Sequence, residues 1–308
     1  MKQRMISEVL KEKCGTKVYR LALSSGSTCP NRDGTCVLPD GTRLFGGCTF
    51  CSEGGSGEFA APFLPVREQI ESARSRVDKK IPARIPAKDR RYIAYFQSFT
   101  NTYGPADRYR KMFEEAISHP QVVALSVGTR PDCLPEETVD MLRNLQEKYG
   151  KEVWVELGLQ TVSEETAVRI HRGYTLPVFE DAYRRLTDAG LTVIVHVILY
   201  LPGEDREDML STIRYLAGLY PALQGVKLQL LNILRGTAMA AEYEEKTFYL
   251  PTLEEYCSFL RECLDILPEE TVIHRLTGDG PKQLLIAPLW VADKKRVINT
   301  MRRAGLVH

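Results

Sequence analysis

Four of the eight cysteines in this 308-residue chain lie in one short stretch, residues 29–51. They are Cys29, Cys36, Cys48 and Cys51, and turn-forming Gly, Pro, Asp and Asn residues lie between them. Residues of this kind do not build a packed core, and several thiolates that converge favour zinc or an iron–sulfur cluster. A strand-like run at 18–23 precedes the stretch, so we expect the thiols to lie where a strand ends. The rest of the chain is expected to act as a scaffold for this site.

Composition places the chain among globular proteins. Apolar residues make up 44% and charged residues 26% of the sequence, and the formal net charge is only +1. No apolar run approaches the roughly 18 residues of a membrane span, and residues 1–13 are charged and amphipathic, unlike a signal peptide. We therefore expect a cytoplasmic protein with no membrane partner. In that reducing compartment clustered cysteines indicate metal binding or catalysis, whereas the scattered cysteines are expected to be packing residues: Cys14, Cys133, Cys257 and Cys263.

β-rich runs and helical patterns alternate along most of the chain. After the run at 18–23, strands are predicted at 92–98, 122–127, 153–159, 192–199 and 226–231. Helices are predicted at 66–77, 106–118, 135–149, 164–170, 178–189 and 206–219. Such alternation indicates right-handed βαβ units around a parallel sheet. Six β/α units predict an α/β fold, a partial (β/α)6 TIM-like open barrel.

The end of the chain is predicted to form an extension packed on the barrel. A helix is expected at 253–267, a β-like segment at 271–276 and a basic helix at 293–303. We therefore divide the chain into a barrel domain, 1–235, whose cysteine loop spans 25–58, and a helical and β C-terminal extension, 236–308.

Polar side chains gather at the predicted carboxyl ends of the strands, where parallel barrels place their chemistry. A period of two along the fourth strand puts Glu156 and Gln160 on one face. A buried carboxylate needs a partner, which for Glu156 could be a core arginine. His196 could likewise be a core histidine, and Arg172 could meet a carboxylate or a ribose, or form a surface ion pair. Together these residues indicate a cofactor pocket, and its other candidates are Gln97, Thr100 and Ser126.

Two tracts are strongly basic although the chain as a whole is close to neutral. Residues 74–91 contain eight Lys or Arg and two Asp, a local charge of 8 − 2 = +6. A second tract, 294–303, carries Lys294, Lys295, Arg296, Arg302 and Arg303. Each tract is either a solvated surface or a surface that contacts the phosphates of a nucleic acid.

Several motifs resemble those of one enzyme superfamily. A cysteine loop that ends in Cys-x-aromatic-Cys and precedes a six-unit open barrel is similar to the radical S-adenosylmethionine (SAM) superfamily. The segments GGCTFC, YFQSFTNTYGP, SVGTRPDCL, VWVELGLQT and RIHRGY resemble more narrowly its YhcC/YtqA-like members, which are related to the radical domain of the elongator catalytic subunit. The similarity covers nearly the whole chain.

The resemblance implies a cluster and a cofactor. The ligands of a 4Fe-4S cluster would be Cys29, Cys48 and Cys51, while Cys36 departs from the family pattern and is not expected to be a ligand. Three thiolates leave one iron open for SAM, whose reductive cleavage would form a 5′-deoxyadenosyl radical that abstracts a hydrogen atom. The backbone around Phe50 would contact adenine. Because FQSFTN replaces the superfamily's Gly-Gly-Glu-Pro, Gln97 or Thr100 would contact the methionine amino group.

The resemblance also implies a substrate class. Relatives are associated with the wobble uridine of tRNA, where a carboxymethylaminomethyl group is trimmed toward aminomethyl. The tRNA would bind through tracts 74–91 and 294–303, and an electron donor such as flavodoxin or ferredoxin would reduce the cluster. Two alternatives are a radical SAM enzyme for a small metabolite or a peptide, and a zinc-binding nucleic-acid adaptor in which all four clustered cysteines form a closed structural site.

Overall fold

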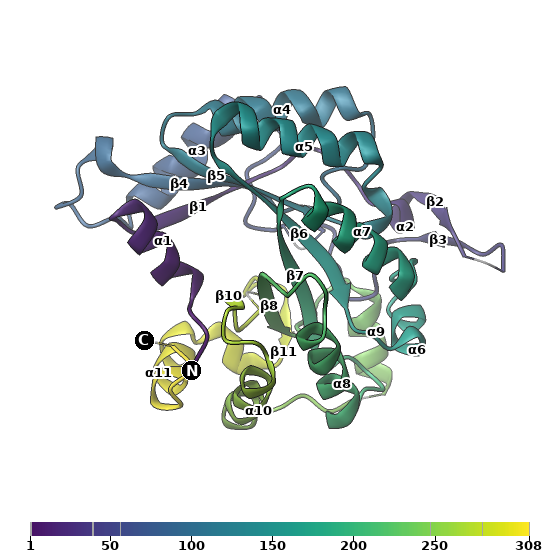
Figure 1. Ribbon diagram of the computed structural model, residues 1–308. Helices are drawn as coiled ribbons and strands as arrows, with labels where there is room; N and C mark the ends of the chain where they lie inside the picture. Colours follow the sequence, from purple (N-terminus) through teal and green to yellow (C-terminus); the bar gives the residue numbers. More distant parts are fainter. Residues whose placement is uncertain (1, 39, 56, 247, 279, 308) are drawn as a thin grey trace.

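A curved parallel sheet with helices along its outer face forms the centre of the protein (Figure 1). The computed structural model describes residues 2–38, 40–55, 57–246, 248–278 and 280–307. Within these residues the sheet order is β1 (Val18–Leu23), β4 (Arg91–Phe96), β5 (Val122–Thr129), β6 (Glu152–Gln160), β7 (Thr192–Leu199), β8 (Gly225–Leu230) and β10 (Val272–Arg275). The predicted α/β fold, a partial TIM-like barrel, is confirmed.

The sheet contains one strand more than the six predicted units. The β-like segment of the C-terminal extension forms β10, which pairs in parallel with β8 through Val272 and Gly225. α10 (Leu253–Ile266) precedes this strand along the chain. Because β1 and β10 are the two edges of the sheet, the barrel is open between them. The domain boundary at residue 235 stays a prediction, although β10 joins the two parts in one sheet.

The helices lie within a few residues of their predicted positions. They are α3 (Val66–Asp78), α4 (Ala106–Ser118), α5 (Glu136–Tyr149), α6 (Glu164–Arg169), α7 (Leu176–Asp188) and α8 (Arg206–Ala217). α8 begins after Asp205, whose carboxylate accepts hydrogen bonds from two free backbone amides of the first turn. Apolar helix faces and outward strand residues such as Leu21 and Phe96 share the main core. No helix in the described part of the chain is long and apolar enough to cross a membrane.

The interior of the barrel has an apolar layer followed by a polar one. At the amino ends of the strands, Ile93, Trp154 and Ile194 pack against Ile6 and Leu10 of α1 (Ile6–Cys14). Successive residues of a strand face opposite sides of the sheet, so residues two positions further on share the interior face. The interior residues two positions beyond Ile93, Trp154 and Ile194 are Tyr95, Glu156 and His196. α1 therefore covers the amino end, and polar groups lie toward the carboxyl ends.

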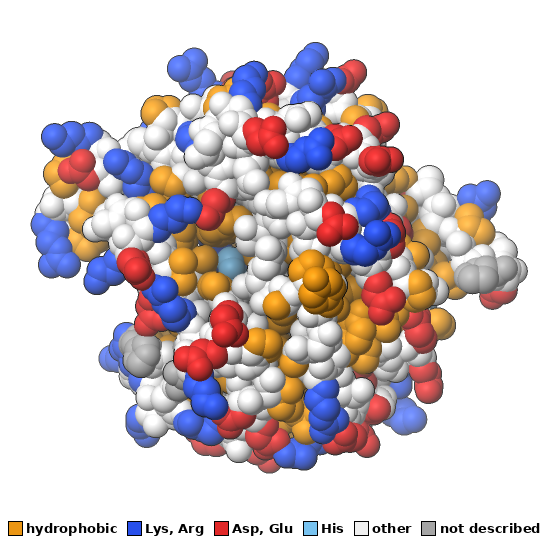
Figure 2. All heavy atoms as spheres, in the orientation of Figure 1, with side chains coloured by type: hydrophobic (Ala, Val, Ile, Leu, Met, Phe, Trp, Pro, Cys, Tyr) orange, Lys and Arg blue, Asp and Glu red, His pale blue; other side chains and the backbone are white. Residues whose placement is uncertain are grey.

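The basic tract 74–91 lies at the amino ends of the strands, opposite the cysteine loop. It comprises the end of α3, η1 (Ala87–Asp89) and the first residue of β4. In Figure 1 this connection is on the left, whereas the hairpin of β2 (Gly34–Val37) and β3 (Arg43–Phe45), part of the cysteine loop, is on the right. Figure 2 shows Lys and Arg side chains gathered over the left end. The tract therefore cannot line the cavity beside the cysteines.

Candidate active site

The cysteine loop follows β1, as predicted, and backbone hydrogen bonds tie it to the carboxyl ends of the strands. Cys29 precedes the short helix α2 (Pro30–Asp33), whose amides donate to its carbonyl oxygen. The amide of Thr49 donates to the carbonyl of Ile170, beyond α6, at 3.1 Å. The carbonyl of Thr49 accepts from the amide of Met239 at 2.8 Å, in α9 (Ala238–Glu245). Segments that follow β6 and β8 thus hold the second half of the loop in place.

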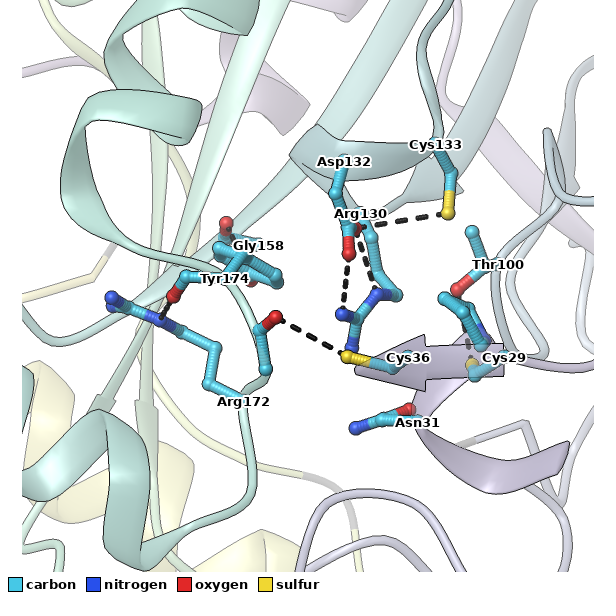
Figure 3. Close-up of polar contacts among 12 residues, drawn as sticks. Cys29, Asn31, Cys36, Thr100, Arg130, Asp132, Cys133, Gly158, Arg172 and Tyr174 are labelled. Carbon is cyan, nitrogen blue, oxygen red and sulfur yellow. Dashed lines mark hydrogen bonds and ion pairs between the residues drawn. The ribbon is translucent and has the colours of Figure 1, made fainter. Parts of the chain in front are cut away.

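Three of the clustered thiols line one cavity of about 230 Å³, and they are the predicted cluster ligands. Cys29 Sγ lies 3.0 Å from Thr100 Oγ1, and Asn31 Nδ2 donates to Cys48 Sγ at 3.2 Å (Figure 3 shows Cys29, Thr100 and Asn31). A hydrogen bond with Cys51 lowers the pKa of Cys48 to about 7, whereas burial raises the pKa of Cys29 to about 11. The structure therefore brings Cys29, Cys48 and Cys51 together at one opening.

Cys36 points away from these three thiols. It lies on β2, is buried, and donates a hydrogen bond to the carbonyl of Gly173 at 3.3 Å (Figure 3). Gly173 has φ +82°, and a Cβ there would lie 2.7 Å from Cys36 Sγ, so both conformation and space require glycine. The exclusion of Cys36 from the ligand set stays a prediction, for which this packing supplies a structural reason.

The donor set suits a cluster better than a single ion. No three His, Cys, Asp or Glu side chains of the described residues gather closely enough to hold one metal ion. This finding disfavours the closed four-cysteine zinc site. A four-iron cluster is larger, so its thiolates surround it at wider separations. Gly158 also lines the cavity, and a Cβ there would lie 3.0 Å from Tyr174 Oη, so glycine preserves the space. The residues present therefore fit a three-thiolate 4Fe-4S cluster with SAM beside it.

Glu156 is the centre of a buried polar network inside the barrel. Its carboxylate accepts hydrogen bonds from Ser126 Oγ at 2.8 Å and His196 Nε2 at 2.9 Å, and it forms a fully buried ion pair with Lys227. Burial opposes the charge, but Lys227 and His196 hold the pKa of Glu156 well below its usual range. Burial lowers the pKa of Lys227 to about 7 and that of His196 to about 4. The partner of Glu156 is thus a lysine, not the core arginine considered from the sequence.

The remaining predicted pocket residues also line the cavity: Phe50, Gln97, Thr100 and Gln160. Phe50 packs against an apolar cluster that includes Ile198 and Leu231. Gln160, at the end of β6, has φ 69°, and Phe99, just beyond β4, has φ 59°. Left-handed backbone is uncommon for residues other than glycine and gathers at functional sites. The carboxyl ends of the strands therefore carry strain as well as polar groups.

Arg172 lines the cavity, but the protein itself occupies most of its donors. Nη1 donates to the carbonyls of Leu159 and Thr161, and Nε donates to the carbonyl of Tyr174 (Figure 3). Nη2 lies 3.3 Å from both carboxylate oxygens of Glu164. The side chain is only 1% exposed, so the ion pair is not the surface pair considered from the sequence. Arg172 braces the turn that follows β6.

Lys227, Arg130 and Arg275 are charged residues of the cavity region that were not predicted from the sequence. Lys227 could have been found from the sequence, since it is a lone lysine in the apolar strand 226–231. An unpaired ammonium would be costly to bury there, so its presence indicates a buried acidic partner. Arg130 follows β5 and forms a bidentate ion pair with Asp132, with N–O distances of 2.9 and 2.7 Å. Its guanidinium lies 4.8 Å from the ring centre of Tyr174. Nothing in the local pattern near Arg130 distinguishes it from a surface arginine.

Comparisons with known proteins identify the family. The sequence pattern of the Radical SAM superfamily matches residues 45–216, and that of the Radical_SAM C-terminal domain matches residues 223–304. The chain belongs to the radical SAM superfamily, whose cofactors are a 4Fe-4S cluster and SAM. Cys48 and Cys51 lie inside the first match, and Cys29 lies before it. The resemblance inferred from the motifs is confirmed.

Individual relatives agree with this assignment. The uncharacterized protein YtqA of Bacillus subtilis is 40% identical over 295 residues, 96% of this chain and 86% of YtqA. YhcC of Escherichia coli is 34% identical over 92% of this chain and 86% of YhcC. Elongator complex protein 3 of Schizosaccharomyces pombe is 26% identical over 61% of this chain and 34% of that protein. The structure of Methanocaldococcus infernus Elp3 has a TM-score of 0.60 at 19% identity and covers 79% of this chain and 60% of that one, which shows the shared fold.

Proposed function

We propose that this radical SAM enzyme modifies tRNA, converting a carboxymethylaminomethyl group on the wobble uridine to aminomethyl. The observation that carries the proposal is a set of two exposed aromatic side chains, here called the aromatic rim: Phe45 lies on the cysteine loop, and Phe63 lies beside Gly26 at its start. Phe45 on β3 is 64% exposed, and Phe63, 55% exposed, stacks with the guanidinium of Arg108. Unpaired RNA bases are recognised by stacking on aromatic rings and on arginine. A rim of this kind suits a single-stranded anticodon loop.

The reaction divides between the bound groups and the chain. When bound, the cluster and SAM would supply a 5′-deoxyadenosyl radical, and SAM would be the two-electron oxidant. Loss of a hydrogen atom and one electron from the N–CH2 carbon of the carboxymethyl group would give an imine, which water hydrolyses to the aminomethyl amine and glyoxylate. The three thiols of the cavity would hold the cluster, and Asn31 would orient Cys48 through its side-chain amide. Phe50, Ile198 and Leu231 give the cavity an apolar wall. Such a wall keeps water away from reactive groups.

The tract 74–91 supports the tRNA proposal only weakly. It lies at the amino ends of the strands, whereas the cavity lies at the carboxyl ends. Two of its arginines also have protein partners: Arg90 pairs with Asp78 at 2.8 Å and Arg74 with Glu71 at 3.1 Å. This placement favours the second candidate, in which the substrate is a small metabolite or a peptide.

Basic residues near the start of α11 (Lys294–Arg303) support tRNA more directly. Exposed Lys282 follows Pro281, which lines the cavity. Lys282 and Lys295 line the same shallow hollow on the surface. We therefore place the first phosphate contacts there, and contacts with 74–91 only for RNA that extends along the barrel.

A flavodoxin or a ferredoxin would supply the electron, and we place the enzyme in the cytoplasm. The thiols that would hold the cluster must stay reduced, and the cytoplasm is a reducing compartment.

The test uses anaerobically reconstituted holoenzyme and two tRNAs that differ only at the wobble position. One carries carboxymethylaminomethyluridine and the other carries unmodified uridine. Mass spectrometry should find aminomethyluridine only with the first tRNA, together with increased 5′-deoxyadenosine. Formation of 5′-deoxyadenosine that neither tRNA changes would contradict the tRNA proposal and favour a small substrate.

A further inference from the structure

The polar layer of the barrel carries more positive than negative charge. The ionised side chains of this layer are Glu156, Lys227 and Arg275, and Arg20 adds a further positive charge from one layer below, where it is paired with Ile93. The carboxylate of Glu156 is already engaged by Lys227 and by two neutral donors. Neither Arg20 nor Arg275 forms an ion pair with any carboxylate in the described residues. Two positive charges therefore lack a counter-charge inside the barrel.

The two guanidiniums belong to the two edges of the sheet. Arg20 lies on β1 and Arg275 on β10, the edge strands between which the barrel is open. In the sheet Arg20 is paired with Ile93, and Arg275 is paired with Lys227. The side chains of Ile93 and Lys227 face the interior, so both arginines also face the inside of the barrel. Arg275 lines the cavity beneath the cysteine loop. Arg275 thus lies at the cavity, and Arg20 lies deeper in the barrel on the opposite edge strand.

Most of the donors in this region have no acceptor. Nε and Nη2 of Arg20 are buried without a hydrogen-bond partner, and so is Nδ1 of the adjacent His274. Arg275 has a single long hydrogen bond, 3.4 Å from Nη1 to Gln229. A buried guanidinium without an acceptor is costly, and its planar donors match both oxygens of a carboxylate. An anion that entered this space would complete the network.

We propose that Arg20 and Arg275 form a carboxylate-binding subsite inside the barrel, and that the carboxymethyl group of the substrate occupies it. This assignment rests on the proposed function, and it adds the residues that would recognise the carboxylate of the substrate. It also explains why a barrel would keep two uncompensated arginines near an already neutral pair.

SAM carries a carboxylate too, but the position of Arg20 favours the substrate. Arg20 is three residues before the end of β1, which at roughly 3.3 Å per residue places it about 10 Å below the cysteine loop. The cluster and SAM would lie beside that loop, because Cys29, Cys48 and Cys51 would be the cluster ligands. A group that reaches the polar layer must therefore extend further into the barrel.

The experiment compares two anticodon stem-loop RNAs bound to the reconstituted holoenzyme. One carries carboxymethylaminomethyluridine, and the other carries its neutral amide of nearly the same shape. Wild type should bind the carboxylate RNA about tenfold tighter, as expected for one charge-assisted pair. Arg20→Gln and Arg275→Gln should each bring that ratio close to one without changing the affinity for the amide RNA. Arg184→Gln is the matched control, an exposed arginine of α7 outside both basic tracts, and it should keep the wild-type ratio.

Other readouts separate the possible failures. If both variants keep the tenfold preference, the subsite is wrong even though the enzyme acts on tRNA. If Arg20→Gln instead weakens SAM binding tenfold, the carboxylate is that of SAM and the substrate assignment is overturned. If wild type converts neither RNA, the proposed function fails, and acetate then tests the subsite alone. Acetate should raise the unfolding temperature of wild type more than that of Arg275→Gln, and equal shifts would overturn the subsite.

A stability measurement guards against a merely structural role. Arg20 has buried donors without an acceptor, and Arg275 has only one long hydrogen bond. Arg20→Gln and Arg275→Gln should therefore unfold at the same or a higher temperature than the ligand-free wild type. A lower unfolding temperature for both would show that the arginines support the fold, and the subsite would then be rejected. Arg20→Lys keeps the charge without the planar donors and should recover only part of the preference for the carboxylate RNA.

Discussion

The cysteine loop and the polar network around Glu156 hold their chemical groups in opposite ways. Cys29, Cys48 and Cys51 of the loop line a cavity, and their hydrogen bonds are few, such as that between Cys29 and Thr100. The carboxylate of Glu156 has three partners from three neighbouring strands and is completely buried. Strands can satisfy an ionised group within the protein, whereas a loop at the strand ends can leave its donors available to a ligand. Substitutions in the two regions should therefore have different consequences.

The largest expected effect is the loss of the cluster without the loss of the fold. Cys48→Ala should reduce the iron content from about four per chain to near zero after reconstitution, because one of three thiolates is missing. Its far-UV circular dichroism should match wild type, since the loop is held by backbone hydrogen bonds. Cys36→Ala is the control and should keep both iron and 5′-deoxyadenosine formation. Equal iron loss in both variants would show that the ligand set is wrong.

Removing the charge of Glu156 should lower the stability of the fold, in contrast to the loss of a cysteine of the loop. Glu156→Gln leaves Lys227 without its counter-ion in a dry interior, and we expect a loss of about 3–5 kcal/mol in the free energy of unfolding. Urea denaturation of the cluster-free protein measures it. The double variant Glu156→Gln/Lys227→Met should recover most of the loss, because it removes the unpaired ammonium together with its counter-ion. A single-variant loss below about 1 kcal/mol would mean that the pair is solvated.

The network should also make stability depend on pH. Burial lowers the pKa of His196 to about 4 in the folded protein, below roughly 6.5 in the unfolded chain. As pH falls, the unfolded chain binds the proton first, so stability should be lost between about pH 6.5 and 4, by at most about 3 kcal/mol. His196→Gln can still donate to Glu156 but does not titrate, so it should lose less stability in this window. Parallel pH profiles would exclude His196 as the cause.

The smallest effect should distinguish the two ends of the barrel. Lys282→Glu/Lys295→Glu, near the cavity, should weaken tRNA binding on the order of tenfold at low salt. Lys79→Glu/Lys80→Glu, at the amino ends, changes the same charge and should have a smaller effect. Fluorescence anisotropy over a range of salt concentrations measures both variants. A larger effect at the amino end would contradict our placement of the RNA.

Local patterns in the sequence were enough to predict the sheet and the thiol site. The alternation of apolar runs predicted six of the seven strands of the barrel, and the period of two placed Glu156 on the interior face. The spacing and surroundings of the cysteines predicted that they meet after the first strand. Each of these features depends on neighbours a few residues apart, and short-range sterics and hydrophobic burial decide them.

Only the tertiary structure decided which side chains meet. Lys227 is 71 positions from Glu156, and their pairing depends on the register across β6, β7 and β8. The donors of Arg172 are taken by backbone carbonyls that no side-chain pattern reveals, and β10 joins the sheet through contacts with β8. The tract 74–91 could be recognised as basic, but its place opposite the cavity follows from the direction of β4. Long-range register and burial decide these contacts, because they determine which charged groups are buried next to one another.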